Sequence, residues 1–257
     1  MAESDIKSGP AIRALTPASD GGPTVNGAIG LIALATDQVC ELDVGSIIQG
    51  RRPLYISRIA FPPEVTVETL GAMREDMTRA ASLLLPGGRL DVIAYGCTTG
   101  TMVIGEDAVF ARLRAARPDA RCTTPTTAAL AAFAALGMRR IAVLTPYPDA
   151  VNQRVYDYLA SRGLEIVAFG SFNCATDPQI AAVAPDSIAA AAHALDGPGI
   201  DGLFISCTAL RAASVVERLE AELGKPVVAS NQAMAWHALR LCGDAAPVAG
   251  FGGLLRR

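Results

Sequence analysis

Two stretches of this sequence, 110 positions apart, repeat the same pattern of an apolar run followed by Cys and Thr. The first is Asp91–Thr98 (DVIAYGCT) and the second is Asp201–Thr208 (DGLFISCT). Further apolar runs form two more pairs, in the same order and at nearly the same spacing: 29–35 with 141–145, and 121–122 with 227–228. Three pairs at a near-constant offset indicate a duplicated unit. We therefore expect two similar lobes.

Short apolar runs alternate with longer Ala- and Leu-rich helical patterns, which is typical of parallel α/β folds. Hydrophobic residues make up 51% of the sequence and charged residues 18%, which suits sheets buried under helices. The predicted strands are 29–35, 54–56, 91–95, 121–122, 140–144, 165–169, 202–206 and 226–229. The predicted helices are 66–85, 105–116, 126–136, 149–162, 187–195, 212–223 and 232–241. We expect an α/β fold of two pseudo-symmetric lobes, each with a four-stranded parallel sheet, at 27–124 plus 232–257 and at 125–231.

The charge pattern argues against polyanionic and membrane partners. The formal net charge is −3 and no basic run exceeds an arginine pair, so neither nucleic acid nor a membrane surface is an expected partner. Residues 1–26 lack the apolar run of a signal peptide and are expected to form a partly flexible leader. Ala128–Leu136, the most apolar later stretch, is too short to cross a bilayer. A cytoplasmic location is the expectation.

The cysteines and histidines restrict the chemistry. Six cysteines without a secretory signal are expected to be reduced thiols. There is no CxxC pair and only two histidines, so a zinc site has little to build on and no metal site is predicted. Catalysis therefore has to use Cys, Asp, Glu, Tyr and backbone groups.

Cys97 and Cys207 are the strongest candidates for a functional pair. Ligands of parallel α/β sheets bind beyond the carboxyl ends of the strands, where both cysteines are predicted to lie. If the lobes are related by a pseudo-twofold axis, the two thiols approach one ligand from opposite faces. A helix amino end favours a thiolate and lowers its pKa, and the amides there, with the hydroxyls of Thr98, Thr99 and Thr208, form a carboxylate cradle. The other four cysteines lack such pairing and are interpreted as structural: Cys40, Cys122, Cys174 and Cys242.

Three other residues have two interpretations each. Tyr147 follows a predicted strand and either places its phenol in the cleft or packs in the core. Asn231 follows the last strand and either binds substrate or caps the next helix. Asp37 follows the first strand. It either orients a cationic group of the substrate or fixes a proton, or it is a solvated helix cap.

At these residues the sequence resembles the aspartate/glutamate racemase superfamily. The resemblance is greatest to its branch of maleate cis-trans isomerases, arylmalonate decarboxylases and ectoine-utilisation isomerase-like proteins. It covers roughly residues 28–253, and its order and spacing are more specific than a single Cys-Thr pair. The matching elements are Asp91–Thr101 (DVIAYGCTTGT), Thr145-Pro146-Tyr147 ahead of Val151-Asn152, Ile205–Thr208, and Gly224–His237.

The resemblance implies two Rossmann-like lobes, an active site at their interface, no metal or organic cofactor, and a small carboxylate substrate. It implies that Cys97 and Cys207 are the catalytic pair. In the racemases one thiolate removes an α-proton and the opposite thiol returns one. In the maleate isomerases a thiolate adds to the alkene, the saturated bond rotates, and elimination gives fumarate. The residues expected to bind substrate are Asp37, Thr98, Thr99, Tyr147, Thr208, Ala209 and Asn231.

One departure from the resemblance affects the expected substrate. Maleate isomerases carry an asparagine where this chain has Asp37, and an anion there repels a dicarboxylate unless it is protonated or paired. We therefore expect a racemase or epimerase of the ectoine-utilisation branch, with maleate isomerisation as the alternative. Arylmalonate-type decarboxylation, which uses only the second cysteine, and non-catalytic binding of a carboxylate are less favoured functions. An even-numbered homo-oligomer is expected from base rates alone.

Overall fold

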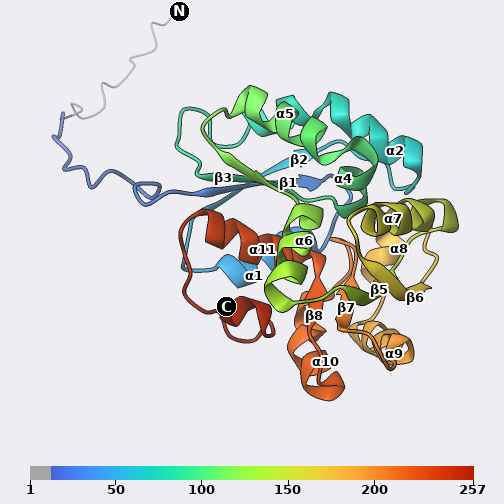
Figure 1. Cartoon of the computed structure of the whole chain (residues 1–257). Helices are drawn as coiled ribbons and strands as arrows, with labels where there is room; N and C mark the ends of the chain where they lie inside the picture. The colour runs from blue at the N-terminus through green and yellow to red at the C-terminus, as the bar shows by residue number, and fades with distance from the viewer. Residues whose placement is uncertain (1–12) are drawn as a thin grey trace, which may run out of the picture.

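The computed structural model describes residues 13–257, and it folds into two parallel α/β lobes (Figure 1). The first sheet has the strand order β2-β1-β3-β4 and the second has the order β6-β5-β7-β8. The first four strands are β1 (Ile29–Leu34), β2 (Leu54–Ile59), β3 (Val92–Tyr95) and β4 (Arg121–Thr123). The other four are β5 (Arg140–Thr145), β6 (Glu165–Ser171), β7 (Gly202–Ile205) and β8 (Val227–Ala229). The expectation of two four-stranded parallel sheets is confirmed.

The two lobes repeat each other strand by strand. In the first lobe Ile29 pairs with Val92, and in the second Ile141 pairs with Gly202. All strand pairs are parallel, and every residue of β1, β3 and β7 is buried. Strands covered on both faces explain why these runs are continuously apolar rather than alternating.

Helices cover both sheets and fill the space between them. The first lobe contributes α1 (Cys40–Ile48), α2 (Val67–Ala72), α3 (Met77–Ser82), α4 (Thr98–Ile104) and α5 (Glu106–Ala116). The remaining helices are α6 (Pro125–Leu136), α7 (Asp149–Ser161), α8 (Asp177–Ala182), α9 (Pro185–Leu195), α10 (Val216–Leu223) and α11 (Ser230–Leu241). Short 3-10 turns occupy Met73–Glu75, Ala213–Val215 and Leu254–Arg256.

Helix α6 shows how local sequence sets an element's limits. The Thr124 side chain accepts from the Thr127 amide at the start, and Pro125 occupies the first turn, where its missing N–H costs nothing. Gly137 ends the helix in the left-handed region, at φ 72°. The helix then lies between the two sheets and packs on α11 (Figure 1).

Some sequence expectations on helices and strands were wrong. The helix expected over 66–85 is broken into α2, a 3-10 turn and α3, and both Met73 in the turn and Met77 in α3 are buried. The strand expected at 54–56 continues to Ile59, and α4, which starts directly after Cys97, is a separate helix ahead of the one expected over 105–116.

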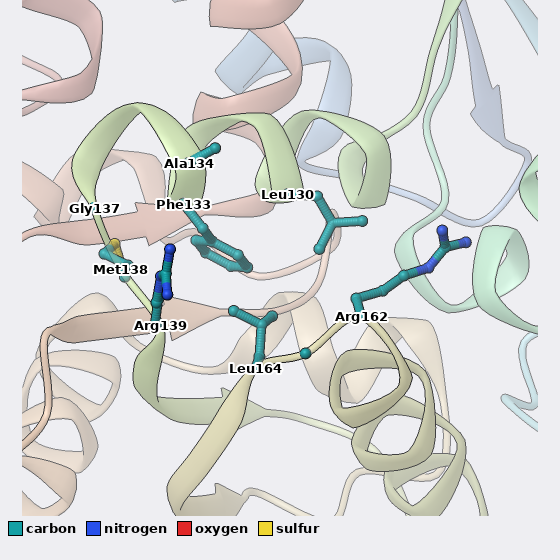
Figure 2. Close-up of a pocket in the computed structure, with 9 residues that line it drawn as sticks. Leu130, Phe133, Ala134, Gly137, Met138, Arg139, Arg162 and Leu164 are labelled. Carbon is teal, nitrogen blue, oxygen red and sulfur yellow. The ribbon is translucent and has the colours of Figure 1, made fainter.

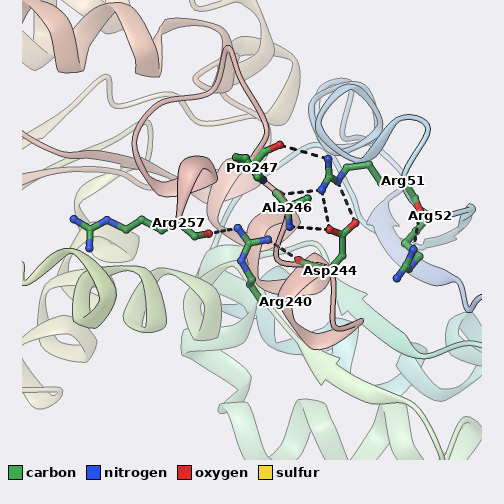
Figure 3. Close-up of polar contacts among 7 residues, drawn as sticks. All are labelled: Arg51, Arg52, Arg240, Asp244, Ala246, Pro247 and Arg257. Carbon is green, nitrogen blue, oxygen red and sulfur yellow. Dashed lines mark hydrogen bonds and ion pairs between the residues drawn. The ribbon is translucent and has the colours of Figure 1, made fainter.

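The C-terminal segment packs back onto the first lobe. Helix α11 packs on α1 as well as on α6. Beyond it, Arg51 contacts the Asp244 carboxylate through Nη2 at 2.7 Å and Nε at 3.2 Å, and Arg240 donates to the Asp244 carbonyl at 2.6 Å (Figure 3). The end of the segment also contacts the other lobe, where Gly253 donates to Glu220 and Arg256 to Glu217 of α10. The grouping of 232–257 with residues 27–124 as the first domain stays a prediction.

The expected leader, residues 1–26, lies only partly within the described residues, which begin at residue 13. Residues 13–22 are in neither helix nor strand and are mostly exposed.

Candidate active site

The two cysteines of the repeat line one cleft between the lobes. Cys97 follows the end of β3 by two residues, and Cys207 follows the end of β7 by two. The cleft is lined by both cysteines together with Leu34, Asp37, Phe61, Val65, Leu70, Thr98, Thr99, Tyr147, Asp177, Thr208 and Ala209. Apart from Asn231, every site residue expected from the sequence is in this set.

The cleft is closed by segments of both lobes. The free space between its side chains is about 10 Å³, which is close to the room needed by one water molecule. Residues Glu64 and Thr176 form an antiparallel bridge across the lobes, and the Val65 amide donates to the Ala175 carbonyl at 3.0 Å. The bridge thus joins the two lobes beside the cleft, where Val65 and Asp177 are lining residues.

Cys97 is held at the amino end of α4. It is the N-cap of that helix and is 4% exposed. Its Sγ accepts a hydrogen bond from the Gly100 amide at 3.2 Å. The sequence expectation of a cysteine at a helix start is confirmed here.

Cys207 has a different environment, and the expectation that a helix follows it in the same way was wrong. It is 5% exposed, and its Sγ accepts from the Ala209 amide at 3.3 Å. The next residues form a tight turn in which the Ala212 amide donates to the Leu210 carbonyl at 2.8 Å. The Thr208 carbonyl accepts a hydrogen bond from Asn231 Nδ2 at 2.8 Å. Its partner is therefore a side chain and not an amide of a following helix.

The expected lowering of the thiol pKa values is also contradicted. Burial raises the pKa of Cys97 to about 12, against the lowering effect of the Gly100 amide. Burial likewise raises the pKa of Cys207 well above its ordinary value, and the charges of Asp177 and Asp37 contribute to the raised pKa of each thiol. Desolvation of a thiolate in this closed cleft outweighs the helix amides. Both thiols are therefore protonated at neutral pH in this arrangement.

The threonine hydroxyls expected to cradle a carboxylate join the lobes. Thr98 Oγ1 donates to Ser230 Oγ at 3.0 Å, and Thr208 Oγ1 donates to the Gly96 carbonyl at 3.3 Å. Both pairs connect one lobe to the other. The substrate-binding role of Thr98, Thr99 and Thr208 stays a prediction.

Tyr147 lies in the cleft and is 3% exposed. Burial raises the pKa of its phenol well above the ordinary value, and the adjacent Cys207 raises it further. Tyr147 is therefore a neutral hydroxyl beside one of the two thiols. This placement agrees with the first of its two interpretations, since the phenol borders the cleft.

Asp37 is buried rather than solvated. It is 3% exposed, and its Oδ1 accepts from the amides of Val39 at 2.7 Å and Cys40 at 2.9 Å. Burial raises the pKa of its carboxyl. The interpretation as a solvated cap is wrong, because the cap it forms at the start of α1 is enclosed by the cleft.

Sequence reasoning missed Asp177, which lines the same cleft from the second lobe. It opens α8, is 5% exposed, and accepts a hydrogen bond from the Thr36 hydroxyl. Burial, and after it the charge of Asp37, raises its pKa to about 6 against the lowering effect of the Thr36 hydroxyl. The only sequence signal was Thr176-Asp177-Pro178, a helix-start pattern that does not reveal a cleft.

Asn231 is a neighbour of the cleft. Its Nδ2 donates to Asp43 Oδ2 at 3.0 Å and to the Thr208 carbonyl at 2.8 Å. Burial raises the pKa of Asp43 to about 6. Asn231 thereby holds the backbone that carries Cys207, and direct substrate contact by Asn231 stays a prediction.

A larger hollow of about 580 Å³ lies elsewhere (Figure 2). It is formed by the carboxyl end of α6 and by Arg162–Leu164 after α7, next to the amino ends of β5 and β6. That is the end of the sheet opposite to Cys207. None of its lining residues is a site residue expected from the sequence.

Within residues 13–257, no group of three or more His, Cys, Asp or Glu side chains is arranged to hold a metal ion. No helix in that range has the length and apolar character needed to cross a membrane.

Comparisons with known proteins show which proteins the chain is similar to. Residues 103–255 match the family model described as arylmalonate decarboxylase. The chain is 30% identical to the maleate isomerase of Nocardia farcinica over 240 residues, covering 89% of this chain and 95% of that protein. It is 35% identical to the arylmalonate decarboxylase of Bordetella bronchiseptica over 127 residues, covering 49% of this chain and 53% of that protein.

The fold is shared with solved structures of these proteins. One is a cysteine-to-serine variant of the Nocardia farcinica maleate cis-trans isomerase with a covalently bound succinylcysteine intermediate. It superposes with a TM-score of 0.82 at 25% identity, covering 90% of this chain and 98% of that one.

Proposed function

The chain belongs to the arylmalonate decarboxylase family, and from this premise we propose that it is a cofactor-independent isomerase that acts on a small carboxylate through Cys97 and Cys207. As a member of that family it is an isomerase or a related enzyme. Within that group we favour a two-cysteine racemase or epimerase.

One observation supports this proposal above the others. Two thiols, contributed by equivalent positions of two repeated lobes, line the same enclosed cleft. A decarboxylase of the kind that uses a single cysteine has no need for the first thiol, whereas a reaction that exchanges protons on two faces needs both.

The racemisation step balances with these two groups alone. One cysteine, as thiolate, takes the α-proton of the substrate and becomes a thiol. The other, as thiol, gives its proton to the opposite face of the same carbon and becomes the thiolate. Amides at Gly100 and Ala209 and the neutral phenol of Tyr147 are then positioned to stabilise the anionic sulfur.

Exchange of the α-proton with solvent tests the proposal. Small chiral carboxylates are incubated with the protein in D₂O, and proton NMR with chiral chromatography follows deuterium entry and inversion together. We expect both with the native chain. Cys97→Ser and Cys207→Ser should each lower the rate of inversion by about 10³-fold or more, because a serine hydroxyl is a far weaker acid at either position.

Cys122→Ser is the matched control, because Cys122 is a buried thiol on β4 that does not line the cleft. The two-cysteine mechanism is contradicted if Cys97→Ser or Cys207→Ser inverts the substrate as fast as Cys122→Ser does. Binding of a carboxylate with no exchange for any substrate supports a non-catalytic carboxylate-binding protein instead.

Maleate isomerisation is the second candidate, favoured by the near full-length similarity to the Nocardia farcinica maleate isomerase. In that reaction a thiolate forms a C–S bond to one alkene carbon while the other thiol protonates the neighbouring carbon. After rotation about the single bond, the proton returns and the C–S bond breaks. Fumarate formed from maleate, read by proton NMR, supports this candidate, and no turnover of any cis-alkene diacid removes it.

The finer assignment is a role in ectoine utilisation, with a cyclic or amino-bearing carboxylate as substrate. Asp37 in the cleft supports it, because that carboxylate disfavours a second negative charge on the ligand. We also propose that the chain forms an even-numbered homo-oligomer and that it is located in the cytoplasm.

A further inference from the structure

The ionisable side chains that line the cleft are all acidic. They are Asp37, Asp177, Cys97, Cys207 and Tyr147, and no Lys, Arg or His is among the lining residues. A carboxylate of the substrate finds amides and hydroxyls here. A second carboxylate finds no cation to pair with.

One oxygen of the Asp37 carboxyl makes no hydrogen bond within the described residues, although the nearby Thr208 hydroxyl lowers the pKa of that carboxyl. Its Oδ1 is occupied by the amides of Val39 and Cys40. Among the described residues 13–257, its Oδ2 is buried and has no hydrogen-bond partner. A buried carboxylate oxygen left unpaired is unfavourable, so a group that pairs with it on binding stabilises the complex.

Asp177 is brought to the same place by the other lobe. Its amide donates to the Pro63 carbonyl at 3.0 Å, which ties the start of α8 to the segment after β2. One of its oxygens accepts from the hydroxyl of Thr36, the residue next to Asp37. The two carboxyls therefore border one space although 140 positions of chain separate them.

The neighbouring cation, Arg58, lowers the pKa of Asp37, but by less than burial raises it. Arg58 donates from Nη1 to the carbonyls of Leu34, Ala35 and Asp37, each at 3.1 Å, and its Nε pairs with Glu41 at 2.9 Å. Its guanidinium is thus engaged with backbone oxygens and with a carboxylate outside the cleft. Two buried like charges that a neighbouring cation offsets only in part are unfavourable, and a bound cation stabilises them.

We propose that Asp37 and Asp177 together form a subsite for an ammonium group of the substrate, which makes the substrate an amino-bearing carboxylate rather than a simple dicarboxylate; this rests on the function proposed above. The carboxylate of the same molecule is then left for the amides near the two cysteines.

The subsite also accounts for how a buried thiol becomes reactive. The charges of Asp37 and Asp177 contribute to the raised pKa values of both cysteines, after burial itself. An ammonium group bound between the carboxylates offsets these charges and lowers the thiol pKa values. Substrate binding and thiolate formation are therefore coupled.

Calorimetric titration of the full chain with matched ligands tests the proposal. Two sets of carboxylates are compared. The ligands with an amino group are glycine, proline, and both enantiomers of alanine, aspartate and glutamate. The ligands without one are acetate, propionate, succinate, glutarate and maleate. We expect the tightest ligand to carry an ammonium group and to bind at least 30-fold more tightly than its counterpart without one. The proposal is overturned if succinate, glutarate or maleate binds most tightly, or if no ammonium-bearing ligand binds.

Isosteric variants locate the effect. Asp37→Asn and Asp177→Asn each remove one charge with little change of shape, and we expect each to weaken the ammonium-bearing ligand by roughly 30-fold or more. Glu41→Gln is the matched control, because it removes a nearby negative charge on α1 that does not line the cleft. An equal loss of affinity in all three variants would indicate only a general electrostatic effect of nearby negative charge and would overturn the subsite.

The pH dependence of binding separates this subsite from its rival, in which protonated carboxyls donate to a dicarboxylate. The charged and titratable groups that surround the pair are Cys40, Glu41, Asp43, Arg58, Cys97, Tyr147 and Cys207. Because burial raises the pKa of Asp177 to about 6, binding of an ammonium group should weaken as pH falls from 7 to 5. Binding that strengthens over that range supports the rival and overturns the proposal.

Failure of this inference is distinguishable from failure of the proposed function. Calorimetry reports binding whether or not turnover occurs. Ammonium-selective binding that depends on Asp37 and Asp177 without any proton exchange would sink the isomerase proposal and leave the subsite intact. Isomerisation of a dicarboxylate without an ammonium group would support the isomerase proposal and overturn the subsite.

Discussion

Substitution of Gly100 by alanine should disturb the Cys97 thiol directly, because the new methyl group has no room. A Cβ built at Gly100 lies 2.7 Å from Tyr95 Oη, 2.8 Å from Cys97 Sγ and 2.9 Å from Met73 Cε. All three side chains are at most 4% exposed. Neighbouring atoms must therefore move, and overpacking of this kind costs about 1–3 kcal/mol of unfolding free energy.

The ordinary helix preference acts in the opposite direction and is too small to compensate fully. Alanine in place of a helical glycine stabilises by about 0.5–1 kcal/mol. Gly71 in α2 provides the matched control, since a Cβ there would lie 3.7 Å from its nearest neighbour, Val103. Gly71→Ala should therefore gain stability and Gly100→Ala should lose it.

Urea unfolding followed by circular dichroism measures both changes. For a chain of this size, each kcal/mol moves the melting temperature by about 2–4 °C. Displacement of the sulfur by a fraction of an ångström should also slow the reaction proposed for Cys97 by tenfold or more, in line with the roughly 10²-fold cost of a 1 Å displacement. Gly100→Ala at least as stable as Gly71→Ala would refute the packing argument.

Three buried contacts can be tested in the same way. Thr98→Val should cost about 1–3 kcal/mol in urea unfolding, because it deprives Ser230 Oγ of its 3.0 Å partner across the lobes; adding Ser230→Ala should recover part of that loss, and full additivity in the double-mutant cycle would deny the contact. Burial raises the pKa of Asp177 to about 6, so this carboxyl binds its proton more tightly in the folded chain than in the unfolded chain. The free energy of unfolding of the native chain should therefore fall by on the order of 3 kcal/mol between pH 4 and pH 7, relative to Asp177→Asn. Parallel pH–stability curves for the two proteins would contradict this. Arg51→Ala should destabilise by about 1–2 kcal/mol through loss of the two-pronged contact with Asp244 (Figure 3), and an unchanged urea midpoint would show that the C-terminal segment is held by other contacts.

The repeat and the strand pattern could be predicted because they are local and periodic. Runs such as Ile29–Leu34 and Val92–Tyr95 are continuously apolar, which only a doubly covered strand explains. The expectation of one continuous helix over 66–85 was wrong, because a 3-10 turn interrupts it at Met73–Glu75, where Met, Arg and Glu are all good helix formers. Propensity does not carry that information.

The cleft could be predicted only as a pair of cysteines with their following residues. Cys97 and Cys207 were identifiable because the same dipeptide ends the same strand in both lobes. Asp177 was not, because it comes from the start of a short helix and reaches the cleft through the bridge between Glu64 and Thr176. Nothing near it in the chain indicates that distant partner.

The amino-acid sequence by itself determines two parallel α/β lobes with a thiol at the same strand end of each, since strand burial and a duplicated order of elements are properties of short stretches. Only the tertiary structure decides that Asp37 and Asp177 share the cleft and that both thiols are buried enough to hold their protons. The reason is physical: charge and desolvation depend on which distant groups surround an atom, and that arrangement exists only once the two lobes have packed together.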